Sequence, residues 1–110
     1  MDIEQLIHEW RSQVKAYASS KANADYLREF RKSKKAILMV EAEQKGLKTG
    51  QERESYAYSH PEYIALLEGL RAATEESEDL RWRMRIAEER VGIWRTKQAN
   101  GRKEQGHYAA

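Results

Sequence analysis

The sequence contains no cysteine, so disulfides, thiol catalysis and thiolate metal sites are excluded. It has a single proline and six glycines among its 110 residues, which are too few chain-breaking residues for a fold of many strands and turns. No stretch has the apolar length of a signal peptide or a membrane span. We therefore expect an all-α protein of the cytoplasm that does not associate with a membrane.

The motifs that carry common catalytic chemistry are absent as well. The sequence has no HExxH helix, no GxxxxGK phosphate loop and no GxSxG elbow. His8, His60 and His107 lie far apart in the chain, and none has a metal-ligand partner three or four residues further on. We predict a protein that is not an enzyme and that requires no metal and no cofactor.

Charge is abundant, at 35% of residues, alongside 40% hydrophobic residues. This mixture is typical of long helices with solvated faces. Because the net charge is only +2, binding to a polyanion must come from local clusters of basic residues. We assign residues 1–99 to a single helical domain, and residues 100–110, which are polar and lack periodicity, to a flexible tail.

Apolar residues recur at three- and four-residue spacings along most of the chain. This periodicity predicts four helices, at about residues 3–18, 21–45, 50–58 and 61–99. The serines and asparagine of ASSKAN, at 18–23, favour a kink or a break between the first two helices.

Two capping boxes are predicted at the later helix starts. Thr49 and Glu52 have the required spacing before the helix at 50–58. Ser59 and Glu62 repeat that spacing around Pro61, a residue that the first turn of a helix tolerates.

The predicted helix at 21–45 has an apolar side and a basic side. At about 100° per residue, its apolar side chains fall within roughly 80° of Phe30; they are Tyr26, Leu27, Phe30, Ile37, Leu38 and Val40. A local cationic strip occupies another arc and consists of Arg28, Arg31, Lys32 and Lys35, with Lys34 at the edge of the apolar side.

The long helix predicted at 61–99 has a heptad seam, that is, apolar positions spaced alternately by three and four residues. The seam positions are Tyr63, Leu66, Leu70, Ala73, Ser77, Leu80, Met84, Ala87, Val91 and Trp94. Such a helix is on the order of 58 Å long at about 1.5 Å per residue. We expect one chain to be unable to cover it and predict a coiled-coil-like protomer in a homo-oligomer.

Trp82 lies opposite this seam, in the stretch LRWRMRI at 80–86. Ile86 and Ile93 continue a second apolar stripe from it, and a helix with two apolar stripes usually lies between two neighbours. Trp82 therefore either packs against another helix or, among its arginines, stacks on nucleic-acid bases. The predicted oligomer interface comprises Leu66, Leu70, Leu80, Trp82, Met84, Ile86, Val91 and Trp94.

Two basic clusters are candidates for binding a polyanion, since each phosphate contact releases counterions and repetition in an oligomer multiplies the contacts. The candidate nucleic-acid-binding residues are Arg28, Arg31, Lys32, Lys34, Lys35, Lys45 and Lys48 in the first cluster and Arg81, Arg83 and Arg85 in the second.

YLREFRKSKKAILMVEAEQKGLK at 26–48, followed by YAYSHPEY at 56–63, resembles small phage recombination mediators of the UvsY type. The resemblance lies in an aromatic-Leu start, a Lys-Lys pair, Leu and Glu-Ala at fixed intervals, a basic turn, a tyrosine pair and a long C-terminal helix. It bears on Lys34, Lys35, Leu38, Glu41, Ala42, Lys45 and Lys48. It implies a homo-oligomer that binds single-stranded DNA and helps a recombinase replace single-strand-binding protein.

The leading hypothesis is therefore a non-enzymatic, oligomeric accessory protein that binds single-stranded DNA in phage-type recombination or replication. The alternative is a small helical interaction factor, such as a phage-encoded inhibitor of a host protein or an assembly factor, whose apolar stripes bind another protein.

Overall fold

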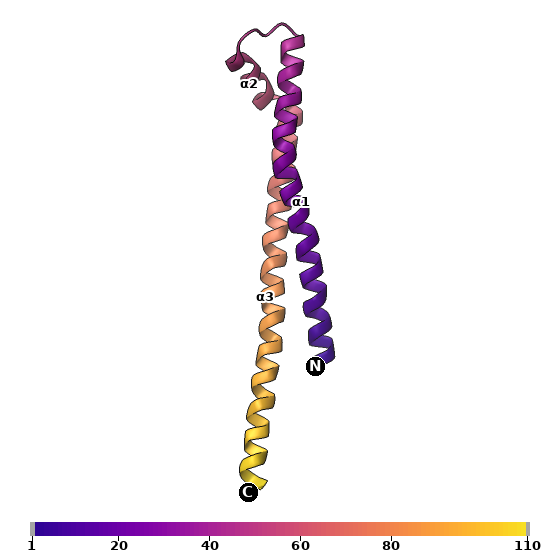
Figure 1. The fold of residues 1–110 in the computed structure, drawn as a ribbon, viewed down its shortest axis with the longest axis vertical. Coiled ribbons are helices and arrows are strands. Elements are labelled where there is room, and N and C mark those ends of the chain that lie inside the picture. Colours follow the sequence, from indigo (N-terminus) through magenta and orange to yellow (C-terminus); the bar gives the residue numbers. More distant parts are fainter. Residues whose placement is uncertain (1, 110) are drawn as a thin grey trace. The chain divides into compact units, whose positions relative to one another are not determined.

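The computed structural model describes residues 2–109, and these form three helices (Figure 1). Helix α1 spans Ile3–Gln44, α2 spans Gly50–Ser59 and α3 spans Pro61–Ala109. No strand occurs among residues 2–109, which confirms the all-α fold class. None of these helices combines the length and the apolar character that crossing a membrane requires, as judged over the described residues.

Helix α1 is continuous through residues 18–23, so the predicted break there is wrong. The segment holds Ala18 and Ala22 and is followed by Ala24, and alanine is the best helix former. Ser20 is half-buried and Ala24 is buried. Small side chains at these inward positions let a neighbouring backbone approach closely, and this tertiary packing outweighs the weak propensity of the serines.

The expectation of a flexible tail at 100–110 is also wrong for residues 100–109, because α3 continues to Ala109. Residue 110 lies outside the described residues. The segment from Gln98 to Gln105 consists largely of Lys, Arg, Glu, Gln and Ala, all of which are good helix formers. Gly101 and Gly106 each cost only about 1 kcal/mol relative to alanine, and no proline interrupts the hydrogen-bond ladder of this part of α3.

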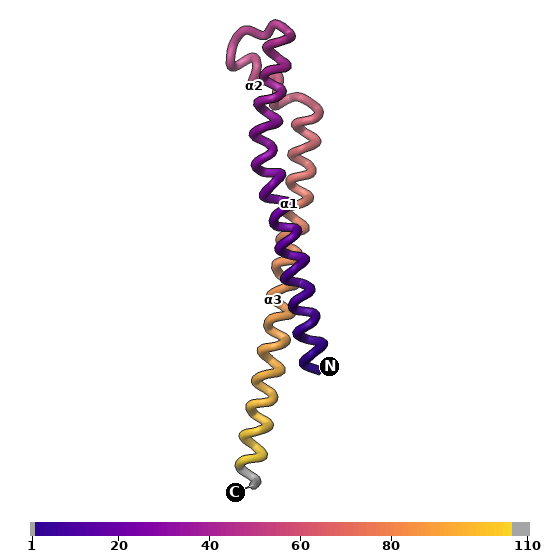
Figure 2. Tube along the Cα trace, turned by 45° about the vertical axis from the view of Figure 1, so that its right-hand side comes forward, coloured from indigo at the N-terminus to yellow at the C-terminus, as the bar shows by residue number. Residues whose placement is uncertain are grey.

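The chain divides into two compact units. The central unit comprises Ser19–Ser77 and contains the C-terminal part of α1, all of α2 and the start of α3. Its core is formed by Leu38, Ala57 and Tyr63, one from each helix, with Met39 packed against them. In this unit α1 and α3 lie side by side in both views (Figures 1 and 2).

The terminal unit combines the residues up to Ala18 with those from Glu78 onward. Leu6, Ala87 and Val91 are buried in it. Arg90 joins the two helices, since its Nη1 lies 3.0 and 2.8 Å from the two carboxylate oxygens of Glu9. The two segments run side by side in both figures as far as the N-terminal end of α1, and the last part of α3 continues beyond it.

Every position of the predicted α3 seam is buried or half-buried: Tyr63, Leu66, Leu70, Ala73, Ser77, Leu80, Met84, Ala87, Val91 and Trp94. The periodicity therefore identified the inward face of α3 correctly. The partner that covers this face within each unit is the chain's own α1. The expectation that one chain cannot cover the seam is wrong, because α1 is long enough to accompany it.

The inward face of α1 differs from its apolar side. Leu27 is half-buried and Leu38 is buried, but Tyr26, Phe30, Ile37 and Val40 are exposed. Between the two leucines, the inward positions at heptad spacing are Arg31 and Lys34, both half-buried. Long basic side chains can bury their methylene stems while their charged ends reach solvent or a carboxylate. The contact line therefore follows the border between the apolar and basic sides.

The turns at the ends of α2 show one correct and one wrong capping prediction. Thr49 caps α2, and its Oγ1 accepts a hydrogen bond from the Glu52 backbone N–H at 3.1 Å. Ser59 does not cap α3, because its hydroxyl donates to the Ser55 carbonyl oxygen at 2.7 Å. His60 takes that role: its Nδ1 accepts a hydrogen bond from the Glu62 N–H at 3.1 Å.

Candidate nucleic-acid interface

Most of the cationic strip on α1 is paired with carboxylates of the same chain. Arg28 Nη1 lies 2.8 Å from Asp25 Oδ1, and Lys32 Nζ lies 3.3 Å from Glu29 Oε2. Lys21 also approaches Asp25, at 3.0 Å. Lys21 and Arg28 together hold the pKa of the Asp25 carboxyl below its ordinary value. Local pairs of this kind partly offset the charge of the strip that the sequence pattern predicts.

Two lysines of the strip form ion pairs with later elements of the central unit. Lys34 Nζ lies 2.7 Å from Glu62 Oε2 on α3, and Lys35 Nζ lies 3.1 Å from Glu54 Oε1 on α2. Lys35 also lies over the Tyr58 ring, 4.8 Å from its centroid. Contact with Tyr58, and then with Glu54, raises the pKa of Lys35. These lysines contribute to packing the three helices together.

The basic turn is likewise engaged with its surroundings. Lys45 Nζ lies 5.2 Å from the Tyr56 ring centroid and 3.9 Å from Glu41 Oε1. Tyr56, followed by Glu41, raises the pKa of Lys45. The Lys48 side chain is exposed, while its backbone N–H donates to Glu52 Oε2 at 3.2 Å. Among the turn residues, Lys48 is the more available to an external anion.

The second cluster surrounds an exposed aromatic ring. Trp82 is 53% exposed and is not among the buried seam positions of α3. The guanidinium carbons of Arg81 and Arg85 lie 5.1 and 5.3 Å from its ring centroid. Arg81 also pairs with Glu78 at 2.9 Å, and Arg83 pairs with Asp79 at 3.0 Å. Acidic residues of the same helix thus partly offset the charge, but the ring remains open to solvent.

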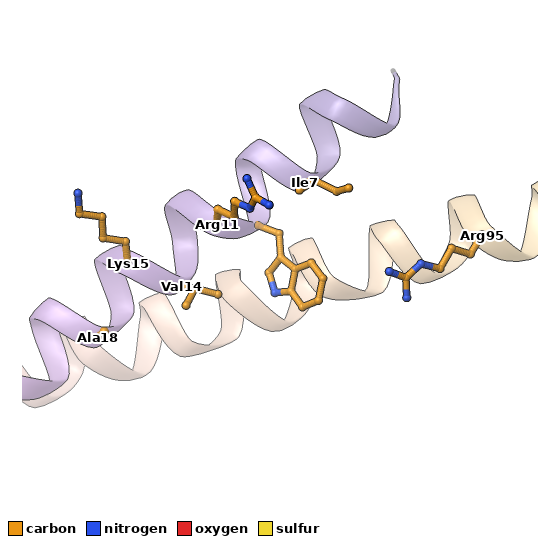
Figure 3. Close-up of a pocket in the computed structure, with 7 residues that line it drawn as sticks. Ile7, Arg11, Val14, Lys15, Ala18 and Arg95 are labelled. Carbon is orange, nitrogen blue, oxygen red and sulfur yellow. The ribbon is translucent and has the colours of Figure 1, made fainter.

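A third group, which sequence reasoning missed, lies in the terminal unit. Trp10 on α1 lines a groove of about 430 Å³ whose rim carries Arg11 and Lys15 from α1 and Arg95 from α3 (Figure 3). The pattern WRSQVK at 10–15 places an aromatic ring beside two cations, and this was the available signal. Trp10 recurs at helical spacing with the apolar residues Ile3, Leu6 and Val14, and helix periodicity does not reveal where such a side chain stays open to solvent.

An uncharged apolar stripe is exposed on α1 in the central unit. Tyr26, Phe30, Ile37 and Val40 are 64%, 37%, 57% and 53% exposed. The rings of Tyr26 and Phe30 stack with centroids 6.0 Å apart. Large apolar residues gathered on one exposed face usually mark a site of interaction.

In the terminal unit, Ile86 and Ile93 are exposed on α3 together with Trp82. The other predicted interface residues of α3, namely Leu66, Leu70, Leu80, Met84, Val91 and Trp94, face the chain's own interior. An interface between copies that uses α3 would therefore rely on Trp82, Ile86 and Ile93.

Comparison with protein-family models, curated proteins and solved structures finds no match for the chain. Within residues 2–109, no group of three or more His, Asp or Glu side chains is arranged to hold a metal ion.

Proposed function

We propose that the protein is a non-enzymatic, homo-oligomeric accessory protein that binds single-stranded DNA in phage-type recombination or replication. The observation that carries the proposal is the exposed Trp82 ring with Arg81 and Arg85 beside it. The resemblance of residues 26–48 and 56–63 to recombination mediators of the UvsY type supports the same conclusion and makes a recombinase and a single-strand-binding protein candidate partners.

Single strands differ from duplexes in offering the faces of their bases. An exposed aromatic ring can stack on such a face, and each base stacked in this way contributes about 1 to 3 kcal/mol. Arg81 and Arg83 hold their carboxylate partners in exposed pairs on one helix. Exposed pairs are worth only about 0 to 1 kcal/mol, so the arginines can exchange these partners for phosphates. Trp82 and its arginines therefore combine stacking with charge.

A protomer with a net charge of only +2 needs several copies of its basic cluster to bind a polyanion strongly. Self-association would provide these copies. The stripe of Tyr26, Phe30, Ile37 and Val40 is the surface that we propose for contact between copies. Burial of apolar area contributes roughly 25 cal/mol per Å². An oligomer would then present several Trp82 clusters to one strand, which raises the apparent affinity without any new type of contact.

The proposal is tested by titrating a fluorescent oligothymidine with the protein at several salt concentrations. We expect binding that weakens as salt rises and that an unlabelled duplex competes poorly. The double variant Arg81→Gln/Arg85→Gln should bind more weakly with a smaller salt dependence. Arg71→Gln is a suitable control, because Arg71 pairs with Glu68 on the same helix but has no tryptophan beside it. Absence of binding at low salt would overturn the proposal.

A second candidate is a helical interaction factor that binds a different protein. The exposed stripe from Tyr26 to Val40 favours it, because the stripe would suit an amphipathic helix of a partner as well as a second copy. The two functions are separated by the same titration combined with light scattering. A monomer that does not bind the oligonucleotide would favour the interaction factor.

A further inference from the structure

We propose that the groove at Trp10 in the terminal unit is a cleft for a base of single-stranded DNA, with neighbouring phosphates held by Arg11, Lys15 and Arg95. This inference rests on the proposed function and assigns it a site beyond Trp82. The groove volume of about 430 Å³ is within the range of about 300 to 1,000 Å³ that is common for small-molecule sites.

The lining combines the two properties that a nucleotide requires. Ile7, Val14 and Ala18 form an apolar surface beside Trp10, which suits the face of a base. Arg11, Lys15 and Arg95 come from both helices that border the groove, as Figure 3 shows. No carboxylate belongs to the lining. An occupant must therefore be apolar in its middle and anionic at its edges.

The rim cations also differ from those of the strip on α1. Arg11, Lys15 and Arg95 form no ion pair within residues 2–109, whereas Lys34 and Lys35 are paired with Glu62 and Glu54. All three rim residues are exposed. A phosphate that approaches the groove meets cations that no carboxylate of the chain neutralises, so binding requires no exchange of partners.

Helix α3 contributes both Arg95 of the groove and the arginines of the Trp82 cluster. At about 100° per residue, Arg81, Arg85 and Arg95 fall within an arc of about 80°, on which Glu88 also lies. From Arg81 to Arg95 the helix rises about 21 Å. At about 3.4 Å per nucleotide along one strand, this distance corresponds to about six nucleotides. A strand of this length can therefore run from Arg95 at the groove to Arg81 beside Trp82.

An acidic amphipathic peptide has a related chemistry, but it offers no flat ring to fill the space beside an indole. The two occupants are distinguished by following Trp10 alone. The variant Trp82→Phe/Trp94→Phe leaves Trp10 as the only tryptophan, and circular dichroism checks that its helix content is unchanged. This variant is titrated with an oligothymidine about twelve nucleotides long and with an abasic oligonucleotide of the same length.

We expect oligothymidine to quench and shift the Trp10 fluorescence, and the abasic strand to bind without quenching. Equal responses to both strands would overturn the base cleft, as would a response to an acidic amphipathic peptide but not to oligothymidine. If the wild-type protein binds oligothymidine while the Trp10 fluorescence does not change, the base cleft is wrongly assigned but the proposed function is unaffected. If the wild-type protein does not bind at low salt, both fail.

The phosphate contacts are tested independently by Arg95→Gln, with Lys97→Gln as a charge-matched control on the next part of the same helix. Lys97 is exposed and does not line the Trp10 groove. Loss of one phosphate contact should reduce the slope of log affinity against log salt by about 0.7 for a single strand. We expect this reduction for Arg95→Gln alone, and equal slopes in the two variants would contradict the assignment.

Discussion

Lys34 Nζ on α1 lies 2.7 Å from Glu62 Oε2 in the first turn of α3. The lysine side chain is 22% exposed, whereas the glutamate is 62% exposed. Lys34 thus lies along the contact between the helices with its ammonium group at the edge, where a carboxylate near a helix N-terminus also suits the helix dipole. A residue that the sequence pattern assigns to a DNA-binding strip instead joins two helices of the central unit.

This pair gives a prediction for pH. Its hydrogen bond with Lys34 holds the pKa of the Glu62 carboxyl below the ordinary value. A lowered folded-state pKa means that the pair stabilises the fold above the ordinary glutamate pKa, and that this contribution is lost as pH falls through the lowered value. An NMR titration of the Glu62 carboxyl should return to the ordinary midpoint in Lys34→Gln. Lys32→Gln, which removes a different pair, should leave the midpoint unchanged.

The start of α3 gives a second prediction. Because His60 Nδ1 accepts the Glu62 N–H, His60→Ala should lower the free energy of unfolding by about 0.5 to 2 kcal/mol, as loss of an N-cap does. Ser59 is exposed and does not cap α3, so Ser59→Ala should lower the free energy of unfolding by less than about half a kcal/mol. Urea denaturation of both variants measures the difference. A larger effect at Ser59 than at His60 would contradict the capping assignment.

The seam of α3 could be predicted from the sequence because its apolar residues alternate at three and four, and only Ser77 departs from that pattern. The inward face of α1 could not be predicted in the same way. Its contact line includes Arg31 and Lys34, while Ile37 and Val40 remain outside. Which line of α1 packs is decided by the partner helix and by carboxylates such as Glu62, and a single-helix pattern contains neither.

The candidate site likewise contains residues that could be predicted from the sequence and residues that could not. Trp82 and its arginines could be recognised because they adjoin in sequence. The ion pairs of Lys34 and Lys35 join residues that are 28 and 19 positions apart, and the rim of the Trp10 groove draws Arg95 from a distant part of the chain. Local spacing cannot indicate such long-range neighbours.

A third prediction concerns the apolar stripe on α1. Ile37→Glu should dissociate the oligomer into monomers while the helix content stays the same. Ile37 is 57% exposed within the chain, so a charge at this position is costly only where a second copy buries it. Light scattering at micromolar concentration measures this, with Arg28→Glu as the control, because Arg28 is exposed and lies about 180° around α1 from Ile37. By contrast, Leu38→Ala, at a position 1% exposed, should cost about 2 to 5 kcal/mol of stability. A wild-type monomer would refute the proposed interface.

A fourth prediction compares the two basic clusters directly. Lys32→Glu/Lys35→Glu reverses charges that pair with Glu29 and Glu54. Arg81→Glu/Arg85→Glu reverses charges that flank the exposed ring of Trp82, although Arg81 also pairs with Glu78. We expect the arginine pair to weaken oligonucleotide binding more at low salt, at equal change in net charge. Greater loss from the lysine pair would move the interface to the central unit.

The most direct test of single-strand binding is Trp82→Ala, measured for both thermal stability and affinity. Because Trp82 is 53% exposed and is not among the buried seam positions of α3, the melting temperature should change little. Loss of base stacking should cost about 1 to 3 kcal/mol of oligothymidine affinity. The contradicting result is a melting temperature that falls by many degrees with affinity per folded protein unchanged, which would show that Trp82 packs between helices of an assembly and does not stack on DNA.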